Sequence, residues 1–343
     1  MAAVRGTFRT SVKATIRLLV GVAVSAACLW FATRGVDWAS VGRVLGEARL
    51  GWMVVAAAFA VSAIAIRSQR WRVLLQPVAT VPFGAAFSAT AIGFGATAVL
   101  PLRLGEIVRP ALLARRVGIG LSPALSSVVL ERIFDLLFVI VCFLALSMVR
   151  TLDANVHRAA MLLGAGAAAG FAALLVAQWR RAQAERLVGA VIGMLPARAR
   201  DALLPVVAGF FDGLSGLGDV RTVLKVLAYS AVIWAINGLP FLFSLLALGI
   251  DVPLVPAALA CVVVVAAFVL LPQAPGFLGT WQAGCVVALR IFNVDENLAV
   301  SFSLLTWIMT MLVTVTLGGI CLAREDLSVR QLLDTSGADD ARQ

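Results

Sequence analysis

The feature that most constrains this chain is a series of apolar runs, several of which are about 20 residues long, the length of a helix that crosses the ~30 Å hydrocarbon core of a bilayer. Of the 343 residues, 62% are hydrophobic and only 13% are charged, whereas soluble domains carry roughly 25% charged residues. The chain has too few polar residues to cover a soluble domain of this size. The sequence therefore predicts an all-α, polytopic membrane bundle formed by the whole chain, residues 1–343.

Eight apolar runs are interpreted as spans, and a shorter ninth run at about 276–292 is either a further span or a re-entrant helix. The predicted spans are about 14–33, 51–67, 82–100, 120–149, 157–178, 222–249, 255–272 and 295–323.

A polar linker divides this single membrane domain into two halves. Residues 179–221 hold several arginines around the apolar stretch "LVGAVIGML", a pattern typical of amphipathic helices that lie against anionic headgroups. The first half then covers about 14–178, the second half covers about 222–323, and a polar tail covers 324–343.

We attribute the formal net charge of +10 to loops at the membrane surface, and we expect no nucleic-acid partner. The arginines cluster in short loops between apolar runs, as the positive-inside rule describes for cytoplasmic loops, and no DNA- or RNA-binding motif accompanies them. We therefore predict a cytoplasmic N-terminus and a cytoplasmic 179–221 linker. Lys13 and Lys225 are the only lysines, and this arginine-rich, alanine-rich composition suggests a bacterial cytoplasmic (inner) membrane.

Residues suited to metal or nucleophilic chemistry are sparse. The five cysteines stand singly in apolar runs, and His157 is the only histidine. Without ligand spacing, the sequence predicts no metal site, no structural disulfide and no cofactor. A nucleotide-binding motif of the G-x-x-x-x-G-K-[ST] type is also missing, so any transport would draw on a gradient or on the concentration difference of the lipid itself.

Two apolar runs end in clusters of proline and glycine. The first reads "VLPLRLGEIVRPALLARR" from Val99, and the second reads "VLLPQAPGFLGTWQAG" from Val269. The first is predicted to be a re-entrant hairpin, because only then do its arginines stay on the cytoplasmic side. Such irregular backbone is tolerated at membrane depth where protein or a water-filled cavity shields it. The residues expected to form the breaks are Pro101, Gly105, Pro272, Pro275, Gly276 and Gly279.

Paired breaks in corresponding positions of two halves are typical of an inverted repeat with a binding site at the repeat interface. Two unrelated loops are the alternative interpretation of the same pattern.

Three charges stand within the apolar run 120–149. Glu131 lies about ten residues inside it, which at 1.5 Å per residue is ~15 Å deep, near the bilayer midplane. Glu131 and Asp135 share one helical face, whereas Arg132 is turned about 100° away. Charges at this depth need partners, so these residues either bind a substrate or form an ion network that only locks helices together.

The first broken segment adds Arg103, Glu106 and Arg109. We expect the hairpin to bring Arg103 and Arg109 toward Glu131, Arg132 and Asp135, where the two carboxylates would hold the arginines until a lipid phosphate competes for them. Two guanidinium groups can hold a phosphate through bidentate contacts, and Glu106 can orient one of them or contact sugar hydroxyls. The alternative is that these charges snorkel to the cytoplasmic surface. Beside the second break, Trp281 and Gln282 can contact a headgroup or simply pack at an interface.

A tryptophan flanked by arginines, Arg70-Trp71-Arg72, follows the second apolar run. Tryptophan at headgroup depth beside arginine is typical of an interfacial anchor. We interpret these three residues as such an anchor, with ligand binding by Arg70 and Arg72 as the alternative.

Four short motifs thus occur in order along the chain: Arg-Trp-Arg at 70–72, Leu-Pro-x-Arg-x-Gly-Glu-x-x-Arg at 100–109, Glu-Arg-x-x-Asp at 131–135, and Pro-x-x-Pro-Gly-x-x-Gly at 272–279. Together they resemble the flippase-like transmembrane domain first described in lysylphosphatidylglycerol synthases. The resemblance implies an integral membrane protein that moves glycolipids or aminoacylated phospholipids between leaflets.

Two features depart from the family. The large soluble aminoacyl-transfer domain of the founding synthases has no counterpart in this sequence, so we do not expect an enzyme. Many members also place a glutamate where this chain has Gln282, which cannot take up a proton, so the resemblance does not support proton coupling through that position.

The function expected from the sequence is a lipid flippase or transporter whose partners are membrane lipids, either anionic or linked to polyprenyl phosphate. One alternative is a membrane enzyme of lipid or glycan metabolism that uses Glu131, Asp135 or Glu106 in acid–base roles. Another is an accessory subunit that contacts envelope-synthesis enzymes.

Overall fold

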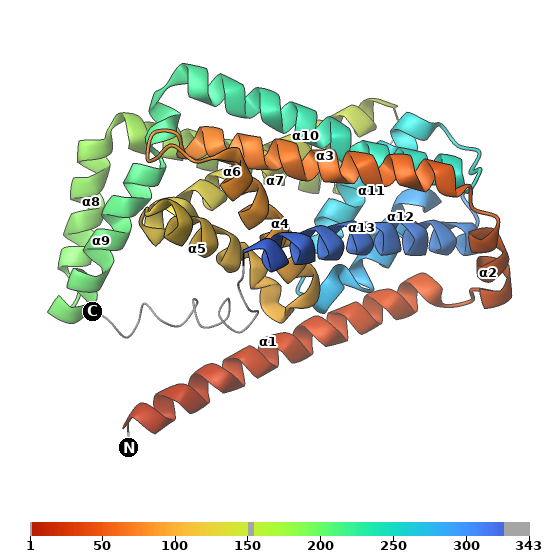
Figure 1. The fold of residues 1–343 in the computed structure, drawn as a ribbon, viewed down its shortest axis with the longest axis horizontal. Helices are drawn as coiled ribbons and strands as arrows, with labels where there is room; N and C mark the ends of the chain where they lie inside the picture. Colours follow the sequence, from red (N-terminus) through yellow and green to blue (C-terminus); the bar gives the residue numbers. More distant parts are fainter. Residues whose placement is uncertain (1, 150–153, 326–343) are drawn as a thin grey trace. The chain divides into compact units, whose positions relative to one another are not determined.

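The computed structural model describes residues 2–149 and 154–325, and every regular element in these residues is a helix (Figure 1). The predicted tail, 324–343, lies almost entirely outside the described residues. The long helices are α1 (Ala2–Thr33), α3 (Leu50–Leu75), α6 (Leu121–Val149), α7 (Ala154–Trp179), α10 (Val220–Ala247) and α13 (Glu296–Arg324). The shorter helices are α2 (Trp38–Gly46), α4 (Phe83–Val99), α5 (Gly105–Val117), α8 (Arg181–Gly193), α9 (Ala197–Gly213), α11 (Leu254–Val269) and α12 (Thr280–Arg290), joined in places by the 3-10 turns η1 (Pro101–Arg103), η2 (Ser215–Gly218) and η3 (Pro275–Phe277).

Four of the described helices are long and apolar enough to cross a membrane, namely α3, α6, α10 and α13. A fifth span is possible if Leu18–Thr33 and α2, which meet at a bend of 84°, are taken together. The helices α4 and α11 are apolar but end at the breaks, after 17 and 16 residues. The all-α membrane class is therefore confirmed, whereas the predicted count of eight spans includes helices too short to qualify by length.

Local capping fixes where α10 begins. The Asp219 carboxylate accepts hydrogen bonds from the Thr222 hydroxyl at 2.8 Å, and from the backbone N–H groups of Arg221 at 3.2 Å and Thr222 at 3.1 Å. These bonds satisfy N–H groups that lack partners in the first turn of a helix. They also favour the ionised carboxylate, and so lower the pKa of Asp219, the Thr222 hydroxyl contributing most.

The chain forms two compact units. Each unit draws residues from both sides of the 179–221 linker, and α3, α4, α10 and α13 each contribute to both. Unit 1 comprises Met1–Ser62, Phe94–Gly105 and Ile236–Gly319, and unit 2 comprises Ala63–Gly93, Glu106–Ala235 and Ile320–Gln343.

Unit 2 has two apolar clusters that hold its helices together. Trp71 and Leu75 of α3 pack with Leu113 of α5 and Val128 of α6, together with alanines of α4. On its other side, α3 packs through Val73 and Leu74 against Leu130 and Phe134 of α6, and against residues of α9 and α10. Helices α3 and α6 therefore take part in both clusters, whereas α5 joins them only in the first.

The carboxylate of Glu325, just after α13, also braces unit 2. It accepts hydrogen bonds from Ser88 on α4 and from Arg116 near the end of α5. One carboxylate thus ties the helix before the first break to the helix after it.

Both predicted breaks are present as interruptions between helices. Helix α4 ends at Val99 and α5 begins at Gly105, with η1 between them; α11 ends at Val269 and α12 begins at Thr280, with η3 between them. In unit 1, η1 and η3 are in contact. A Cβ on Gly276 would lie 3.4 Å from the Ala98 carbonyl oxygen, so the end of α4 lies directly beside η3.

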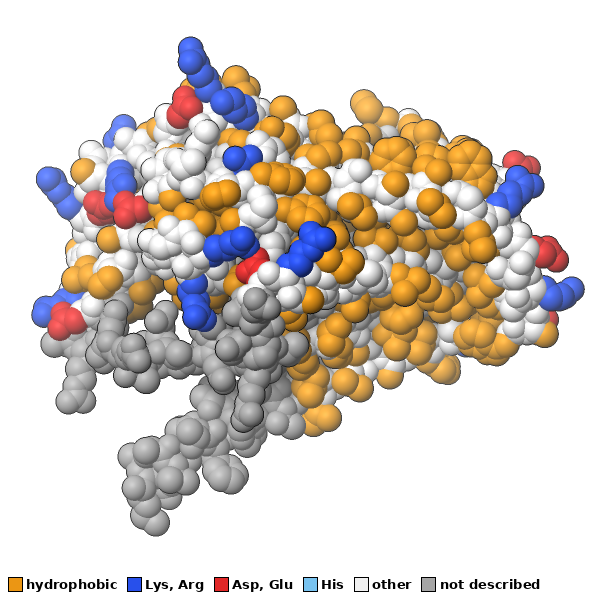
Figure 2. All heavy atoms as spheres, viewed as in Figure 1, with side chains coloured by type: hydrophobic (Ala, Val, Ile, Leu, Met, Phe, Trp, Pro, Cys, Tyr) orange, Lys and Arg blue, Asp and Glu red, His pale blue; other side chains and the backbone are white. Residues whose placement is uncertain are grey.

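The surface of each unit has an apolar part and a charged end. Figure 2 shows hydrophobic side chains over much of the visible face of the helices, with charged residues gathered around α8 and α9 in unit 2 and around α2 in unit 1. Leu50, Val54 and Leu312 of unit 1 are each more than 60% exposed. Exposed apolar surfaces of this extent are unfavourable in water and are favourable against lipid tails.

Candidate functional site

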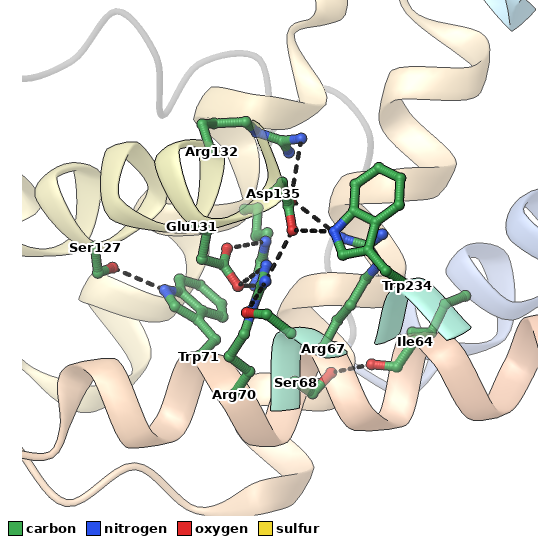
Figure 3. Close-up of polar contacts among 12 residues, drawn as sticks. Ile64, Arg67, Ser68, Arg70, Trp71, Ser127, Glu131, Arg132, Asp135 and Trp234 are labelled. Carbon is green, nitrogen blue, oxygen red and sulfur yellow. Dashed lines mark hydrogen bonds and ion pairs between the residues drawn. The ribbon is translucent and has the colours of Figure 1, made fainter. Parts of the chain in front are cut away.

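Seven charged side chains meet inside unit 2, where α3, α5 and α6 come together. Figure 3 labels those that come from α3 and α6. We refer to these residues as the charge cluster. It consists of Arg67 and Arg70 from α3, Glu106 and Arg109 from α5, and Glu131, Arg132 and Asp135 from α6.

Glu131 is held between two arginines. Its carboxylate lies 2.7 Å from Nη1 of Arg109 and 3.5 Å from Nη2 of Arg70, and its side chain is only 2% exposed. An unpaired carboxylate would be strongly destabilised at such a site. The pairing of Arg109 with Glu131 agrees with the expectation from the sequence, whereas the second partner, Arg70 of α3, was not expected.

Asp135 lies one helical turn further along α6 and shares Arg70 with Glu131. Nη1 of Arg70 is 2.8 Å from Oδ1 of Asp135, and Nη1 of Arg67 is 3.4 Å from Oδ2. From α10, Nε1 of Trp234 donates to Oδ1 at 3.4 Å, and the Ser230 hydroxyl accepts from Arg70 at 2.9 Å. Figure 3 shows Asp135 between Arg70 and Arg132, so this carboxylate links the buried and the open parts of the cluster.

Trp71 positions Arg109. The guanidinium carbon of Arg109 lies 3.9 Å from the centroid of the Trp71 ring, a cation–π contact that strengthens when it is desolvated. Nε1 of Trp71 donates to the Ser127 hydroxyl at 2.8 Å, which fixes the plane of the ring. Ser127, one helical turn before Glu131 on α6, therefore orients the Trp71 ring against which Arg109 packs.

The interfacial interpretation of Arg70 and Trp71 needs correction, because both side chains are buried, at 1% and 0% exposure. The apolar run predicted to end at residue 67 continues as helix α3 to Leu75, which carries these residues into the packed interior of unit 2. Arg72 differs from them: it is partly buried and donates to the Val81 carbonyl at 2.7 Å and to Gln69 at 2.6 Å, bracing the turn after α3.

The charge cluster has one open end. Arg132 and Glu106 are 47% and 37% exposed, and they lie 4.0 Å apart. Arg132 is also 3.8 Å from Asp135, whereas the shortest contacts of Arg109 and Arg70 are 2.7 Å and 2.8 Å. Arg132 is therefore loosely held, whereas Arg70 and Arg109 are fixed, and an incoming anion would meet Arg132 first.

Three members of this site were not singled out from the sequence, namely Arg67, Ser230 and Trp234. A signal existed for each. Arg67 precedes Arg70 by three residues, so both lie on one face of α3, and Ser230 and Trp234 have i, i+4 spacing within an apolar run. Arg103, which the sequence grouped with Arg109, belongs instead to η1 of unit 1, where its backbone has a φ of 56°.

Gln282 does not lie at a surface where it could contact a headgroup, as one of the two interpretations of the sequence expected. It is fully buried in unit 1, and its Oε1 accepts from the backbone N–H of Gly279 at 2.7 Å, which caps α12. Its Nε2 is buried without a hydrogen-bond partner among the described residues. Beside it, Nε1 of Trp281 donates to Thr306 at 3.1 Å, and the Trp281 ring stacks on Phe241. The second break is thus closed by uncharged groups.

The chemistry this site supports is anion binding. Guanidinium groups in a poorly hydrated bundle bind phosphate and carboxylate through charge-assisted hydrogen bonds. Within the described residues, no group of three or more His, Cys, Asp or Glu side chains is arranged to hold a metal ion.

Comparison with known proteins agrees with the four motifs in the sequence. The family model described as the lysylphosphatidylglycerol synthase TM region matches residues 18–318. No curated protein matches the chain. The family match covers both broken segments and every residue of the charge cluster, so the chain belongs to the lysylphosphatidylglycerol synthase TM region family.

Proposed function

We propose that this protein is a lipid flippase or transporter that moves a phosphate-bearing lipid or glycolipid between the leaflets of a bacterial cytoplasmic membrane. The observation that carries the proposal is the charge cluster, in which arginines and carboxylates from α3, α5 and α6 meet inside an apolar helical unit. Charges placed within membrane helices are costly, and they commonly mark a substrate path.

The geometry suggests how a headgroup would be held. Arg132 contacts Asp135 and Glu106 only at 3.8 and 4.0 Å, so a lipid phosphate can compete with these carboxylates for its guanidinium group. Exchange between anionic partners leaves the arginine paired throughout. The lipid tails would stay against the exposed apolar surface while the headgroup crosses.

The proposed architecture adds α4 and α11 to the six long helices, giving eight spans arranged as an inverted repeat with a cytoplasmic N-terminus. Two observations support a repeat: both halves contain a helix broken at a Leu-Pro element, and η1 and η3 are in contact in unit 1. The arginines of α8 and of the turn before it, Arg180, Arg181 and Arg186, favour a cytoplasmic linker.

The enzyme and accessory-subunit alternatives have less support. Glu131 and Asp135 are each paired with at least two guanidinium groups, so both carboxylates are engaged in ion pairs within the cluster and are poorly placed to act on a substrate. We therefore propose a non-enzymatic role.

Reconstitution tests the proposal. Full-length protein is placed in liposomes with phosphatidylglycerol labelled on an acyl chain, and a membrane-impermeant quencher reports how fast label from the inner leaflet becomes accessible. We expect the wild type to accelerate exchange and Arg132→Gln to reduce the rate at least about tenfold, since the loss of one charge-assisted contact is worth roughly 1.5–3 kcal/mol.

Arg290→Gln is the matched control, because Arg290 is a partly exposed arginine of unit 1 whose ion partner is Glu296. If the Arg132→Gln variant exchanged lipid at the wild-type rate, the ion network would have only a structural role. Chemical conversion of the lipid, in place of movement, would favour the enzyme alternative.

A further inference from the structure

Helices α8 and α9 form a hairpin, the α8–α9 hairpin, between two apolar helices of unit 2. Helix α7 ends at Trp179, just before α8, and α10 begins at Val220, just after α9 and η2. Helix α10 is long and apolar enough to cross a membrane, and Figure 1 shows α8 and α9 running steeply across the direction in which α10 begins. A hairpin placed in this way at the end of a spanning helix runs along the membrane surface.

Helix α9 fixes the α8–α9 hairpin against α6. Gly209 and Gly213, one turn apart on α9, face Ser122 and Ser126 of α6. A Cβ on Gly209 would lie 2.8 Å from the Cβ of Ser122, and the Ser122 hydroxyl donates to the Val206 carbonyl at 2.7 Å. Small residues four positions apart on both helices allow this close approach. The hairpin therefore keeps a fixed orientation relative to α6.

Helix α8 turns one apolar side inward and leaves another exposed. Ile192 is buried, and Ala184 packs against the apolar cluster shared by α3, α6, α9 and α10. In contrast, Leu187, Val191 and Met194 are 71%, 61% and 85% exposed. Steps of four and three residues place these three side chains along one side of the helix. We refer to them as the apolar face of α8.

The charges of the α8–α9 hairpin are unevenly paired. Residues 179–214 contain five arginines and three acidic residues, and all three carboxylates form ion pairs with Arg181 or Arg200. Arg180 and Arg186 are exposed, and in the part of the chain that the structure describes no carboxylate pairs with either of them. The hairpin therefore presents positive charge that its own acidic residues do not neutralise.

We propose that the apolar face of α8 docks on an anionic leaflet of the membrane. Arg180 precedes Leu187 by seven residues, about two helical turns, and so lies at the start of this face. Trp179, directly before it, is 68% exposed. Apolar side chains flanked by arginines and an exposed tryptophan are typical of helices that lie in the headgroup region. Through α9, this contact would anchor α6 to the membrane surface, whatever the protein transports.

Charge favours the leaflet over a second copy of the chain. In a two-fold symmetric contact, the same surface of both copies meets, so Arg180 and Arg186 would approach two identical arginines. Anionic headgroups instead supply the opposite charge, and each arginine near them strengthens binding. The uncompensated charge of α8 thus distinguishes between the two possible occupants of its apolar face.

Photocrosslinking identifies what covers this face. In the full-length protein, p-benzoylphenylalanine replaces Val191, or Ala182 as the matched control. Ala182 is also exposed, and it lies nine residues away on the opposite side of α8. The protein is irradiated in liposomes of equal phosphatidylglycerol and phosphatidylcholine, and adducts are identified by mass spectrometry. We expect at least about fivefold more lipid adducts at position 191 than at 182, since only the apolar face enters the headgroup region.

Two variants test the contribution of charge. Among adducts at position 191, phosphatidylglycerol should exceed phosphatidylcholine, and Arg180→Gln or Arg186→Gln should each lower this preference by up to about fivefold, which corresponds to about 1 kcal/mol. Arg200→Gln is the matched control, because Arg200 is paired with Asp201, and should change the preference much less. Either variant alone tests the charge, so one that fails to fold does not end the experiment.

Irradiation in cells tests the other occupants. Crosslinking of position 191 to a second copy, or to another protein, in place of lipid would overturn the inference. Equal lipid capture at positions 182 and 191, or a preference for phosphatidylglycerol that is absent or unchanged in the folded variants, would also overturn it. Lipid capture at α8 does not require transport, so a protein that docks but does not exchange lipid would uphold this inference and reject the flippase.

Discussion

The two broken segments share a sequence pattern but are completed by different chemistry. After the first break, α5 carries Glu106 and Arg109 into the charge cluster of unit 2. After the second break, α12 begins with a neutral cap: Gln282 accepts from Gly279, and Nε1 of Trp307 donates to the Gly276 carbonyl. A Leu-Pro element with nearby glycines thus specifies that a helix stops, while the side chains after it decide whether the break faces charge or is sealed.

The sealed break is also tightly packed. Gly279 has a φ of 86°, and a Cβ placed there would lie 2.0 Å from the Ser25 carbonyl oxygen of α1. The backbone N–H of Ala274 donates to the Ser25 hydroxyl at 2.8 Å. In unit 1, α1 therefore packs directly against the second break, as expected for a segment with a structural role.

The largest expected effect comes from Glu131→Gln in the charged segment. The substitution leaves Arg109 and Arg70 buried with one carboxylate fewer, and breaking a buried ion pair costs about 3–5 kcal/mol. Unfolding in detergent micelles, followed by denaturant titration, should show this loss in the free energy of unfolding. Glu296→Gln, which removes an exposed ion pair, is the control and should change stability by less than about 1 kcal/mol. Equal stabilities for the two variants would contradict the importance of burial here.

A somewhat smaller loss is expected for Gly279→Ala in the sealed segment. The left-handed conformation and the contact with the Ser25 carbonyl together disfavour any Cβ, for a cost of about 3 kcal/mol. Gly42→Ala in α2 is the matched control, since nothing lies within 4 Å of its added Cβ, and it should be neutral or slightly stabilising. Thermal unfolding of both variants measures the difference, and similar midpoints would refute the close approach of α1.

Gln282→Leu should have the smallest effect on stability and sharpens the functional contrast. It removes the acceptor for the Gly279 N–H and leaves that donor buried, at a cost of roughly 1–2 kcal/mol. Because the second break is sealed by neutral groups, lipid exchange in liposomes should continue near the wild-type rate, unlike exchange by Arg132→Gln. Loss of exchange with stability retained would show that the second break also contacts lipid.

The sequence was most informative where structure depends on neighbours along the chain. Hydrophobic run length located the helices, and the proline and glycine clusters located both breaks, because each acts through local backbone geometry. Burial of Glu131 and Asp135 was also foreseeable, since their i, i+4 spacing in an apolar run places both on one inward face.

What the sequence could not determine was the full set of side chains that would meet. The pairing of Arg109 with the acidic residues of α6 was expected, but Arg70, 61 positions from Glu131, was not, because no local pattern specifies such a pair. Arg-Trp-Arg has the composition of an interfacial anchor, yet packing of α3 against α6 buries Trp71 beneath Arg109. The chain alone therefore determined a membrane bundle with two broken helices and inward charges. Tertiary packing decided which of these charges pair and which are buried, because ion pairing and burial depend on distances between helices and not on positions within one.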